Sequence, residues 1–201
     1  MSSYDMKKIV LLSRKSFLAK IQTHIAKIEI NKIKKNIIDI HYSSSVGDKD
    51  LSAKAWEQHG FGIFTNSLSK KLVSKEADVV VHSYKDLPVK NLNKTSFVCL
   101  KRDDPRDIIL IKRSSLNKKK LVIGTSSPRR KYYLKKLKEF LPYQELKSIQ
   151  IRGNVPSRLE KVLNSSKEDG LFIAKAAIDR ILKYGQKIDK KEYKNFRLNF
   201  V

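Results

Sequence analysis

The chain has 201 residues, an apolar fraction of 40% and a single cysteine, Cys99. This length suits one large domain or two small ones, each able to bury its own core. No apolar run approaches the roughly 20 residues that span a bilayer, and the opening MSSYDMKKIV lacks a signal peptide's apolar core, so we expect a cytoplasmic protein without a membrane partner. The lone cysteine fits a reducing compartment, and within the apolar SFVCL we expect it to be buried.

The formal net charge is +24, and basic proteins often bind nucleic acid or acidic surfaces. The lysines are scattered along the whole chain and are densest in KKK at 118–120 and KYYLKKLKEF at 131–140. This distribution favours compositional drift with solvated loops and helices over a nucleic-acid footprint. The sequence has neither a zinc-ligand spacing nor a phosphate-loop glycine pattern, so we expect no metal site.

Apolar strand-like runs alternate with amphipathic helices, which predicts an α/β fold with mostly parallel sheets and no visible internal repeat. The expected elements, in chain order, are a strand at 7–12, a helix with its period at Leu18, Ile21, Ile25 and Ile28, a strand at 36–42, a turn at 59–64, a helix near 64–75, a strand at 77–83, apolar segments at 96–102 and 107–113 that cross into a second unit, a strand at 121–124, a helix near 128–140, a strand at 148–153, a helix near 156–164, a strand at 171–175 and a final short helix.

Hydroxyl and charged side chains follow several of these strands. They are Arg14 and Ser16 after the first strand, Ser83, Lys85 and Asp86 after VVV at 79–81, Thr125, Ser127, Arg129 and Arg130 after LVIG, and Arg152 and Arg158 after SIQ. One such turn alone would more often be an ordinary helix start. Their repetition, at strand ends where α/β sheets collect ligands, predicts a site for an anion with several carboxylates or phosphates. An aspartate among these bases would stay ionised and could stabilise a developing cation.

Four motifs give the chain a resemblance to a known family: HSYKDLP (82–88), KRDDPRD (101–107), GTSSPRR (124–130) and IRGNVPSRL (151–159). Together they resemble porphobilinogen deaminase, also called hydroxymethylbilane synthase, and SRKSFLAKIQ (13–22) and GLFIAKAAIDRI (170–181) extend the resemblance over nearly the whole chain. It implies two periplasmic-binding-protein-like (type II) domains with a cleft between them. Domain 1 would cover 1–98, with 196–201 starting the return to it, and domain 2 would cover 99–195.

The resemblance also implies a reaction. Such enzymes polymerise porphobilinogen into a linear tetrapyrrole on a dipyrromethane primer, releasing ammonia at each step. Asp86 would be catalytic, holding pyrrole nitrogens and stabilising the azafulvene cation that forms when ammonia leaves. The primer and substrate carboxylates would be bound by Arg14, Ser16, Ser83, Lys85, Thr125, Ser127, Arg129, Arg130, Arg152 and Arg158. The family suggests a monomer.

The chain departs from the family pattern in three places. Phe61 in HGFG and Val46 in SVGD replace expected basic residues. We expect the family's third domain to be absent after FRLNFV, together with the cysteine that anchors dipyrromethane, and Cys99 is no substitute. Our preferred hypothesis is therefore a shortened enzyme that either is completed by a separate chain or holds its primer without a thioether. The alternative is a non-catalytic module that binds acidic pyrroles or other polycarboxylates, and nonspecific nucleic-acid binding is a weaker third.

Overall fold

A computed structural model describes residues 8–44, 65–87 and 95–200 of the chain. The chain divides into two compact units, Met1–Arg102 (unit 1) and Asp103–Val201 (unit 2). The domain limits implied by the resemblance, 1–98 and 99–195, stay a prediction. The expected turn at 59–64, Phe61 and Val46 lie outside the described residues. Within the described ranges, no helix combines the length and apolar character needed to cross a membrane.

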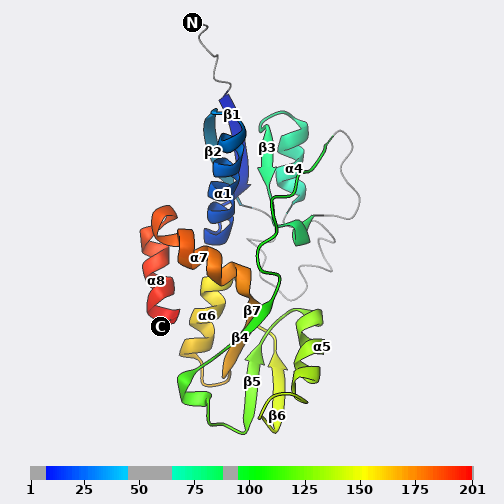
Figure 1. Cartoon of the computed structure of the whole chain (residues 1–201), viewed down its shortest axis with the longest axis vertical. Coiled ribbons are helices and arrows are strands. Elements are labelled where there is room, and N and C mark those ends of the chain that lie inside the picture. The colour runs from blue at the N-terminus through cyan, green and yellow to red at the C-terminus, as the bar shows by residue number, and fades with distance from the viewer. Residues whose placement is uncertain (1–7, 45–64, 88–94, 201) are drawn as a thin grey trace, which may run out of the picture. The chain divides into compact units, whose positions relative to one another are not determined.

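Unit 1 is built on a three-stranded parallel sheet of order β2-β1-β3 (Figure 1). Its described elements are β1 (Lys8–Arg14), α1 (Phe17–Ile33), β2 (Ile37–Ser43), α4 (Asn66–Val73), β3 (Val79–Val81) and the 3-10 turn η1 (Tyr84–Asp86). The middle strand β1 and helix α4 bury Leu12 and Leu68 in one apolar cluster with Ala77. Burial of this apolar surface holds the helix on the sheet and fixes where the strands end.

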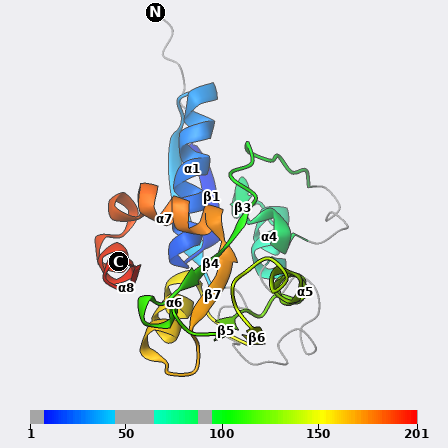
Figure 2. The ribbon, with the colours of Figure 1, turned by 60° about the horizontal axis from the view of Figure 1, so that its bottom comes forward.

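Unit 2 contains a four-stranded sheet of order β4-β7-β5-β6 (Figures 1 and 2). Its elements are β4 (Asp107–Ile111), the 3-10 turn η2 (Arg113–Ser115), β5 (Lys120–Gly124), α5 (Pro128–Leu137), β6 (Glu145–Ile149), α6 (Val155–Asn164), β7 (Gly170–Ala174), α7 (Lys175–Ile188) and α8 (Lys190–Phe200). Strands β5, β6 and β7 are parallel, and β4 runs antiparallel to β7. The core includes Leu121, Ile123, Leu134 and Phe172.

The two sheets share one strand order, since β2-β1-β3 in unit 1 corresponds to β6-β5-β7 in unit 2. In each unit the first parallel strand lies between the second and the third, so its carboxyl end is flanked by the carboxyl ends of both neighbours. The predicted α/β fold with mostly parallel sheets is confirmed. The repeat is one of topology, which explains why the sequence shows none.

Three local predictions are wrong. The strand expected at 148–153 lies at Glu145–Ile149, because Ile151 leaves the ladder and is buried against Gly124, where an added Cβ would lie 3.1 Å from its Cγ2. The final short helix is in fact two helices, α7 and α8, and α8 packs on α6 and α7 with Phe196 buried. The expected burial of Cys99 is the third: Cys99 is exposed, as are Phe97 and Val98.

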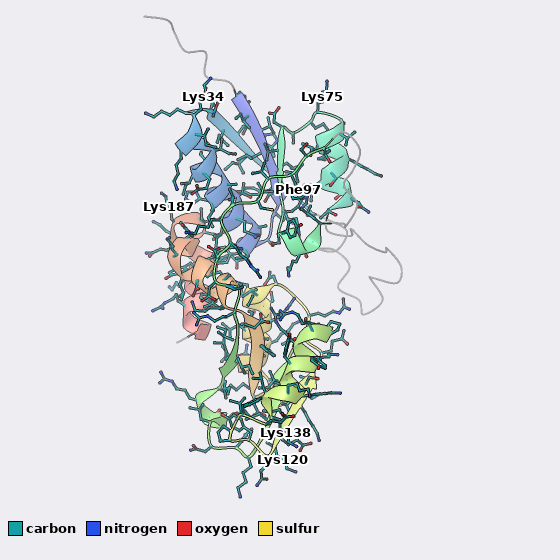
Figure 3. All side chains as sticks on the ribbon, turned by 45° about the vertical axis from the view of Figure 1, so that its right-hand side comes forward. Lys34, Lys75, Phe97, Lys120, Lys138 and Lys187 are labelled. Carbon is teal, nitrogen blue, oxygen red and sulfur yellow. The ribbon has the colours of Figure 1, made fainter. Side chains whose placement is uncertain are left out.

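Most lysines of the described residues lie at the surface of their own unit. Figure 3 labels five that project away from the ribbon, Lys34, Lys75, Lys120, Lys138 and Lys187, and all five are exposed. The cluster at 118–120 is exposed as well. This arrangement is the one expected for a solvated charged surface, whereas the arginines discussed below lie near strand ends.

Candidate functional site

In unit 1, the carboxyl end of the sheet brings Arg14 and Asp86 together. Arg14 ends β1, and Ser13 pairs in register with Val81, the last residue of β3. The chain then turns through η1, where the Asp86 N–H donates to the Ser83 carbonyl at 2.9 Å. This turn places Asp86 Oδ2 4.0 Å from Arg14 Nη1, with about a fifth of each side chain exposed. A largely buried carboxylate therefore faces a guanidinium group at the sheet edge.

The other candidates of unit 1 lie around this pair. Ser16 is the N-cap residue of α1, and its carbonyl accepts from the Lys20 N–H at 3.0 Å. Ser83 Oγ lies 3.0 Å from Nε2 and 3.2 Å from Oε1 of Gln22 on α1. Lys85 is exposed, and the described residues contain no ion pair between Lys85 and Asp86. Asp86 therefore pairs with Arg14, and Lys85 projects into solvent.

His82, next to Ser83, is neutral at physiological pH. Burial lowers its pKa, and the nearby charge of Arg14 lowers it further, to about 4. Its Nε2 atom is buried and has no hydrogen-bond partner among the described residues. The site therefore includes a buried, uncharged imidazole nitrogen to which the sequence analysis assigned no role.

In unit 2, two helix starts face the carboxyl ends of β5 and β6. Ser127 caps α5 through its Oγ, which accepts from the Arg130 N–H at 3.5 Å, and Pro128 begins the helix as predicted. Thr125 is 2% exposed, and its Oγ1 accepts from the Ser127 N–H at 3.3 Å. Asn154 caps α6 by accepting from the Ser157 N–H at 2.9 Å. These caps fix where the arginines of both first turns emerge.

The turn that leads into α6 places Arg158 near Arg130 and Arg152. Gly153 has φ +121°, a conformation that glycine adopts without strain and that other residues rarely adopt. Its carbonyl accepts from Arg158 Nε at 2.6 Å. Burial lowers the pKa of Arg158, and the charges of Arg130 and Arg152 lower it further. We call Arg129, Arg130, Arg152 and Arg158 the arginine cluster.

Asp107, which the sequence analysis left without a role, pairs with two members of this cluster. It is the first residue of β4, and because β4 is antiparallel to β7, it lies opposite Ala174 at the carboxyl edge of the parallel strands. Its Oδ2 is 2.6 Å from Arg129 Nη2 and its Oδ1 is 2.9 Å from Arg130 Nη2. Burial raises the pKa of Asp107, but the hydrogen bonds from Arg130 and Arg129 outweigh that effect and hold the pKa below its usual value.

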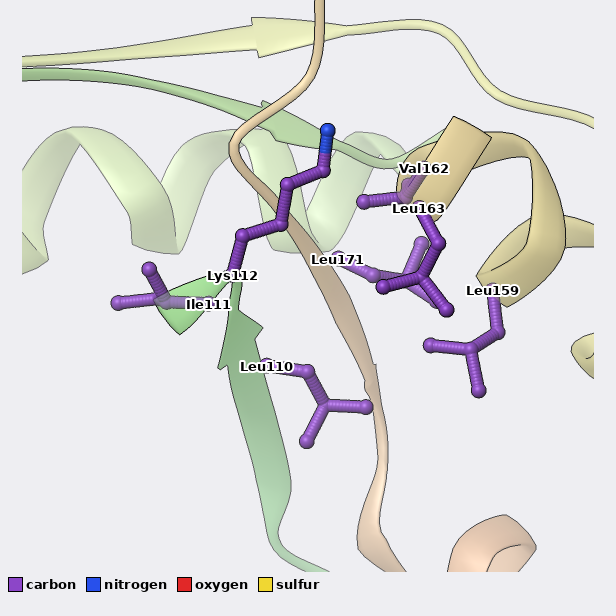
Figure 4. A pocket seen from close by; sticks show the side chains of 7 residues that line it. All are labelled: Leu110, Ile111, Lys112, Leu159, Val162, Leu163 and Leu171. Carbon is purple, nitrogen blue, oxygen red and sulfur yellow. The ribbon is translucent and has the colours of Figure 1, made fainter. Parts of the chain in front are cut away.

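An apolar hollow in unit 2 lies elsewhere (Figure 4). It is lined by Leu110, Ile111, Lys112, Leu159, Val162, Leu163 and Leu171. Lys112 follows the last residue of β4, so it lies at the edge of the sheet opposite Asp107. Its ammonium group donates to the Ser165 carbonyl. The hollow therefore offers no convergent polar groups, and the candidate site is the arginine-rich edge.

The predicted residues thus form one group in each unit. Arg14, Ser16, Ser83 and Asp86 lie at the edge of the first sheet, and Lys85 is exposed. Thr125, Ser127 and the arginine cluster lie at the edge of the second. A common cleft between the two groups stays a prediction. The sequence analysis assigned no role to Gln22, to the neutral His82 or to Asp107. Asp107 is nevertheless part of the motif KRDDPRD.

Comparisons with known proteins agree with the motifs. The family described as "Porphobilinogen deaminase, dipyromethane cofactor binding domain" matches residues 9–197. The porphobilinogen deaminase of Ruminiclostridium cellulolyticum is 36% identical over 178 residues, which is 88% of this chain and 59% of that protein. The probable porphobilinogen deaminase of Picrophilus torridus is 38% identical over 173 residues, 84% of this chain and 58% of that protein. The chain therefore spans less than two thirds of the length of these relatives.

Among solved structures, the chain is similar to the probable amino-acid ABC transporter extracellular-binding protein YtmK from Bacillus subtilis. The TM-score is 0.40 and the identity 11%, over 89% of this chain and 75% of that one. Such values are too low to define the fold, which rests on the strand orders given above.

Proposed function

Since the chain belongs to the porphobilinogen deaminase family, we propose that it catalyses the hydroxymethylbilane synthase reaction. In this reaction porphobilinogen units are joined into a linear tetrapyrrole, and ammonia is released. The observation that carries this proposal is the arginine cluster with its hydroxyl neighbours at the carboxyl edge of unit 2. Two guanidinium groups, those of Arg129 and Arg130, share the single carboxylate of Asp107. The excess positive charge suits a ligand with several carboxylates, and each pyrrole of the substrate carries an acetate and a propionate.

The residues present also fit the dipyrromethane cofactor that the family description names. Guanidinium forks bind carboxylates through two parallel hydrogen bonds, and capped helix starts add N–H groups and hydroxyls. Arg130 has 14% of its side chain exposed, and its Nε is buried without a partner among the described residues. Such a donor set would hold the acidic side chains of dipyrromethane. When bound, the cofactor supplies the pyrrole ring to which the first substrate is joined.

In unit 1 we assign Asp86 the catalytic role. Its carboxylate would accept hydrogen bonds from pyrrole N–H groups and stabilise the positive charge that appears on the substrate as ammonia leaves. Arg14 Nη1 lies 4.0 Å from that carboxylate, so the guanidinium group is the ion-pair partner of Asp86. His82 is neutral above about pH 4, so it adds no cation beside the one that must be stabilised.

Porphobilinogen consumption tests the proposal. The purified chain and its Asp86→Asn variant would be compared with Ehrlich's reagent as the detector, and binding would be measured calorimetrically. We expect turnover to fall by about 100-fold or more in the variant, because a preorganised electrostatic partner of the transition state is removed, while affinity is largely kept. Equal consumption by both proteins would refute the role of Asp86. Binding without consumption by either would instead favour the non-catalytic module.

The proposal also includes three more detailed expectations from the sequence. They are a cytoplasmic location, a monomeric state and a separate chain that supplies a third domain. Size-exclusion chromatography of the purified chain tests the second of these, since a dimer would elute at twice the mass of 23.2 kDa.

A further inference from the structure

We propose that Asp107 is a positioning residue of the anion site: its single carboxylate holds the guanidinium groups of Arg129 and Arg130 side by side, in the arrangement that receives a carboxylate-bearing ligand. This inference deepens the proposed function and takes the ligand class from it. It assigns to the segment KRDDPRD (101–107) a task in binding, although Asp107 itself has the same sign of charge as the ligand.

The first step of the argument is the direction of the two arginines. Arg129 and Arg130 are consecutive residues in the first turn of α5, and consecutive side chains of a helix diverge by about 100°. Two adjacent guanidinium groups also repel each other. Asp107 overcomes both effects because each of its oxygens accepts from a different arginine, at 2.6 Å and 2.9 Å.

The second step is the difference in burial of the three side chains. Exposure is 11% for Asp107 and 14% for Arg130, but 58% for Arg129. An arginine as exposed as Arg129 would ordinarily sample many rotamers in water, at a cost in entropy when a ligand immobilises it. Its contact with the buried carboxylate removes much of that freedom before the ligand arrives.

The third step is the backbone that carries Asp107. The residue begins β4 and pairs with Ala174 of β7, and the Lys175 N–H donates to the Arg106 carbonyl at 3.0 Å. Just before it, Asp104 Oδ2 is 2.6 Å from Arg106 Nη2 and 3.6 Å from Lys175 Nζ. The backbone around Asp107 is therefore bonded to β7 and α7. A residue that positions other side chains needs such a rigid support.

Removing the charge of Asp107 should change anion affinity in opposite directions, depending on whether Asp107 is a counter-charge or a positioning residue. If Asp107 were only a counter-charge, its removal would make the site more positive and strengthen anion binding. If it positions the arginines, removal lets them separate and weakens binding although the net charge favours it. Asp107→Asn keeps the size of the side chain and removes the charge, so it distinguishes the two roles.

The experiment is a calorimetric titration of the full chain with two probes, porphobilinogen and citrate. The proteins are the wild type, Asp107→Asn, Asp107→Glu and the matched control Asp103→Asn, which loses a carboxylate of the same segment whose partner is Arg180 at 2.6 Å. We expect Asp107→Asn to lose about tenfold or more in affinity for both probes, since one to two charge-assisted contacts lose their geometry. Asp107→Glu should recover part of the loss, and the control should bind like the wild type.

The spectroscopic readout is hindered rotation of the guanidinium groups in ¹⁵N NMR. Asp107→Asn should abolish it for Arg129 and weaken it for Arg130, the two arginines that contact Asp107, and should leave the other arginines unchanged. Unchanged or tighter binding by Asp107→Asn would overturn the inference. So would an equal loss in Asp103→Asn, or an Asp107→Glu variant no better than Asp107→Asn. If Asp107→Asn does not fold, the test uses Asp107→Glu and the wild type. Wild-type affinity in Asp107→Glu together with freely rotating Arg129 in the wild type would then overturn the inference. Citrate binding that depends on Asp107, without porphobilinogen binding, would uphold the positioning role and reject the proposed function; no binding of either probe would reject both.

Discussion

Replacing Gly170 by alanine should destabilise unit 2 strongly. Gly170 begins β7 and pairs with Ile111 of the neighbouring strand β4. A Cβ atom at this position would lie 2.4 Å from the Leu110 carbonyl oxygen, where ordinary contacts begin at 3.4 Å. The two atoms must therefore separate by about 1 Å, and the obstacle is backbone, which cannot rotate away as a side chain can. Overpacking of this kind costs about 3 kcal/mol, the upper end of its usual range.

Urea denaturation followed by circular dichroism measures this loss. For an m-value of about 2 kcal/mol/M, a change of about 3 kcal/mol lowers the midpoint by about 1.5 M. Amide hydrogen exchange then assigns the change to β4 and β7, because local opening reports on each element separately. The matched control is Gly124→Ala, whose Cβ would meet the methyl group of Ile151 at 3.1 Å. That side chain can move, so we expect less than about 1 kcal/mol. A Gly170→Ala midpoint within about 0.5 M of wild type would refute the reasoning.

Two further predictions concern buried titratable groups. Asp169 accepts from Ser115 Oγ at 2.7 Å, Lys118 Nζ at 2.6 Å and the Val122 N–H at 2.8 Å, so Asp169→Asn should cost about 2 kcal/mol in a urea titration. Burial raises the pKa of Asp169, but the hydrogen bonds from Lys118, Val122 and Ser115 outweigh that effect and hold the pKa below the usual value of an aspartate. The stabilisation that Asp169 gives is therefore present above that usual value and is lost as the pH falls further. Acid unfolding curves of equal slope for the wild type and Asp169→Asn would contradict this. His82, whose pKa falls from 6.5 to about 4 on folding, binds a proton more readily when unfolded, so stability should decrease as the pH drops from about 6.5 to about 4. His82→Gln should remove that dependence, which thermal unfolding across this range would reveal.

Much of the architecture could be predicted from local patterns. Apolar strand runs followed by hydroxyl and basic residues mark the carboxyl ends of parallel strands, and the structure places Arg14, Asp86 and the caps of α5 and α6 there. The predicted burial of Cys99 failed, because an apolar run need not enter a sheet or a core.

Asp107 was missed for a different reason. A strand's sequence does not reveal whether it runs parallel or antiparallel to its neighbours, and a parallel β4 would have carried its first residue to the opposite edge of the sheet. Only the antiparallel pairing with β7 brings Asp107 to the arginines. Gln22 was missed because a single polar residue on a helix is usually solvated, and only the packed structure reveals its contact with Ser83.

The order of the strands in unit 2 also sets the order in which the protein can fold during synthesis. Strand β4 leaves the ribosome first but borders only β7, which is made last of the four. The pair β5 and β6 and their helix α5 can assemble early, because their contacts are close in sequence. Arg129 and Arg130 therefore emerge on a structured helix while Asp107 still lies on an unpaired strand. A nascent chain gains its ordered anion site only when residues 170–174 have docked, so ligand binding would mark completion of the unit and stabilise its final step.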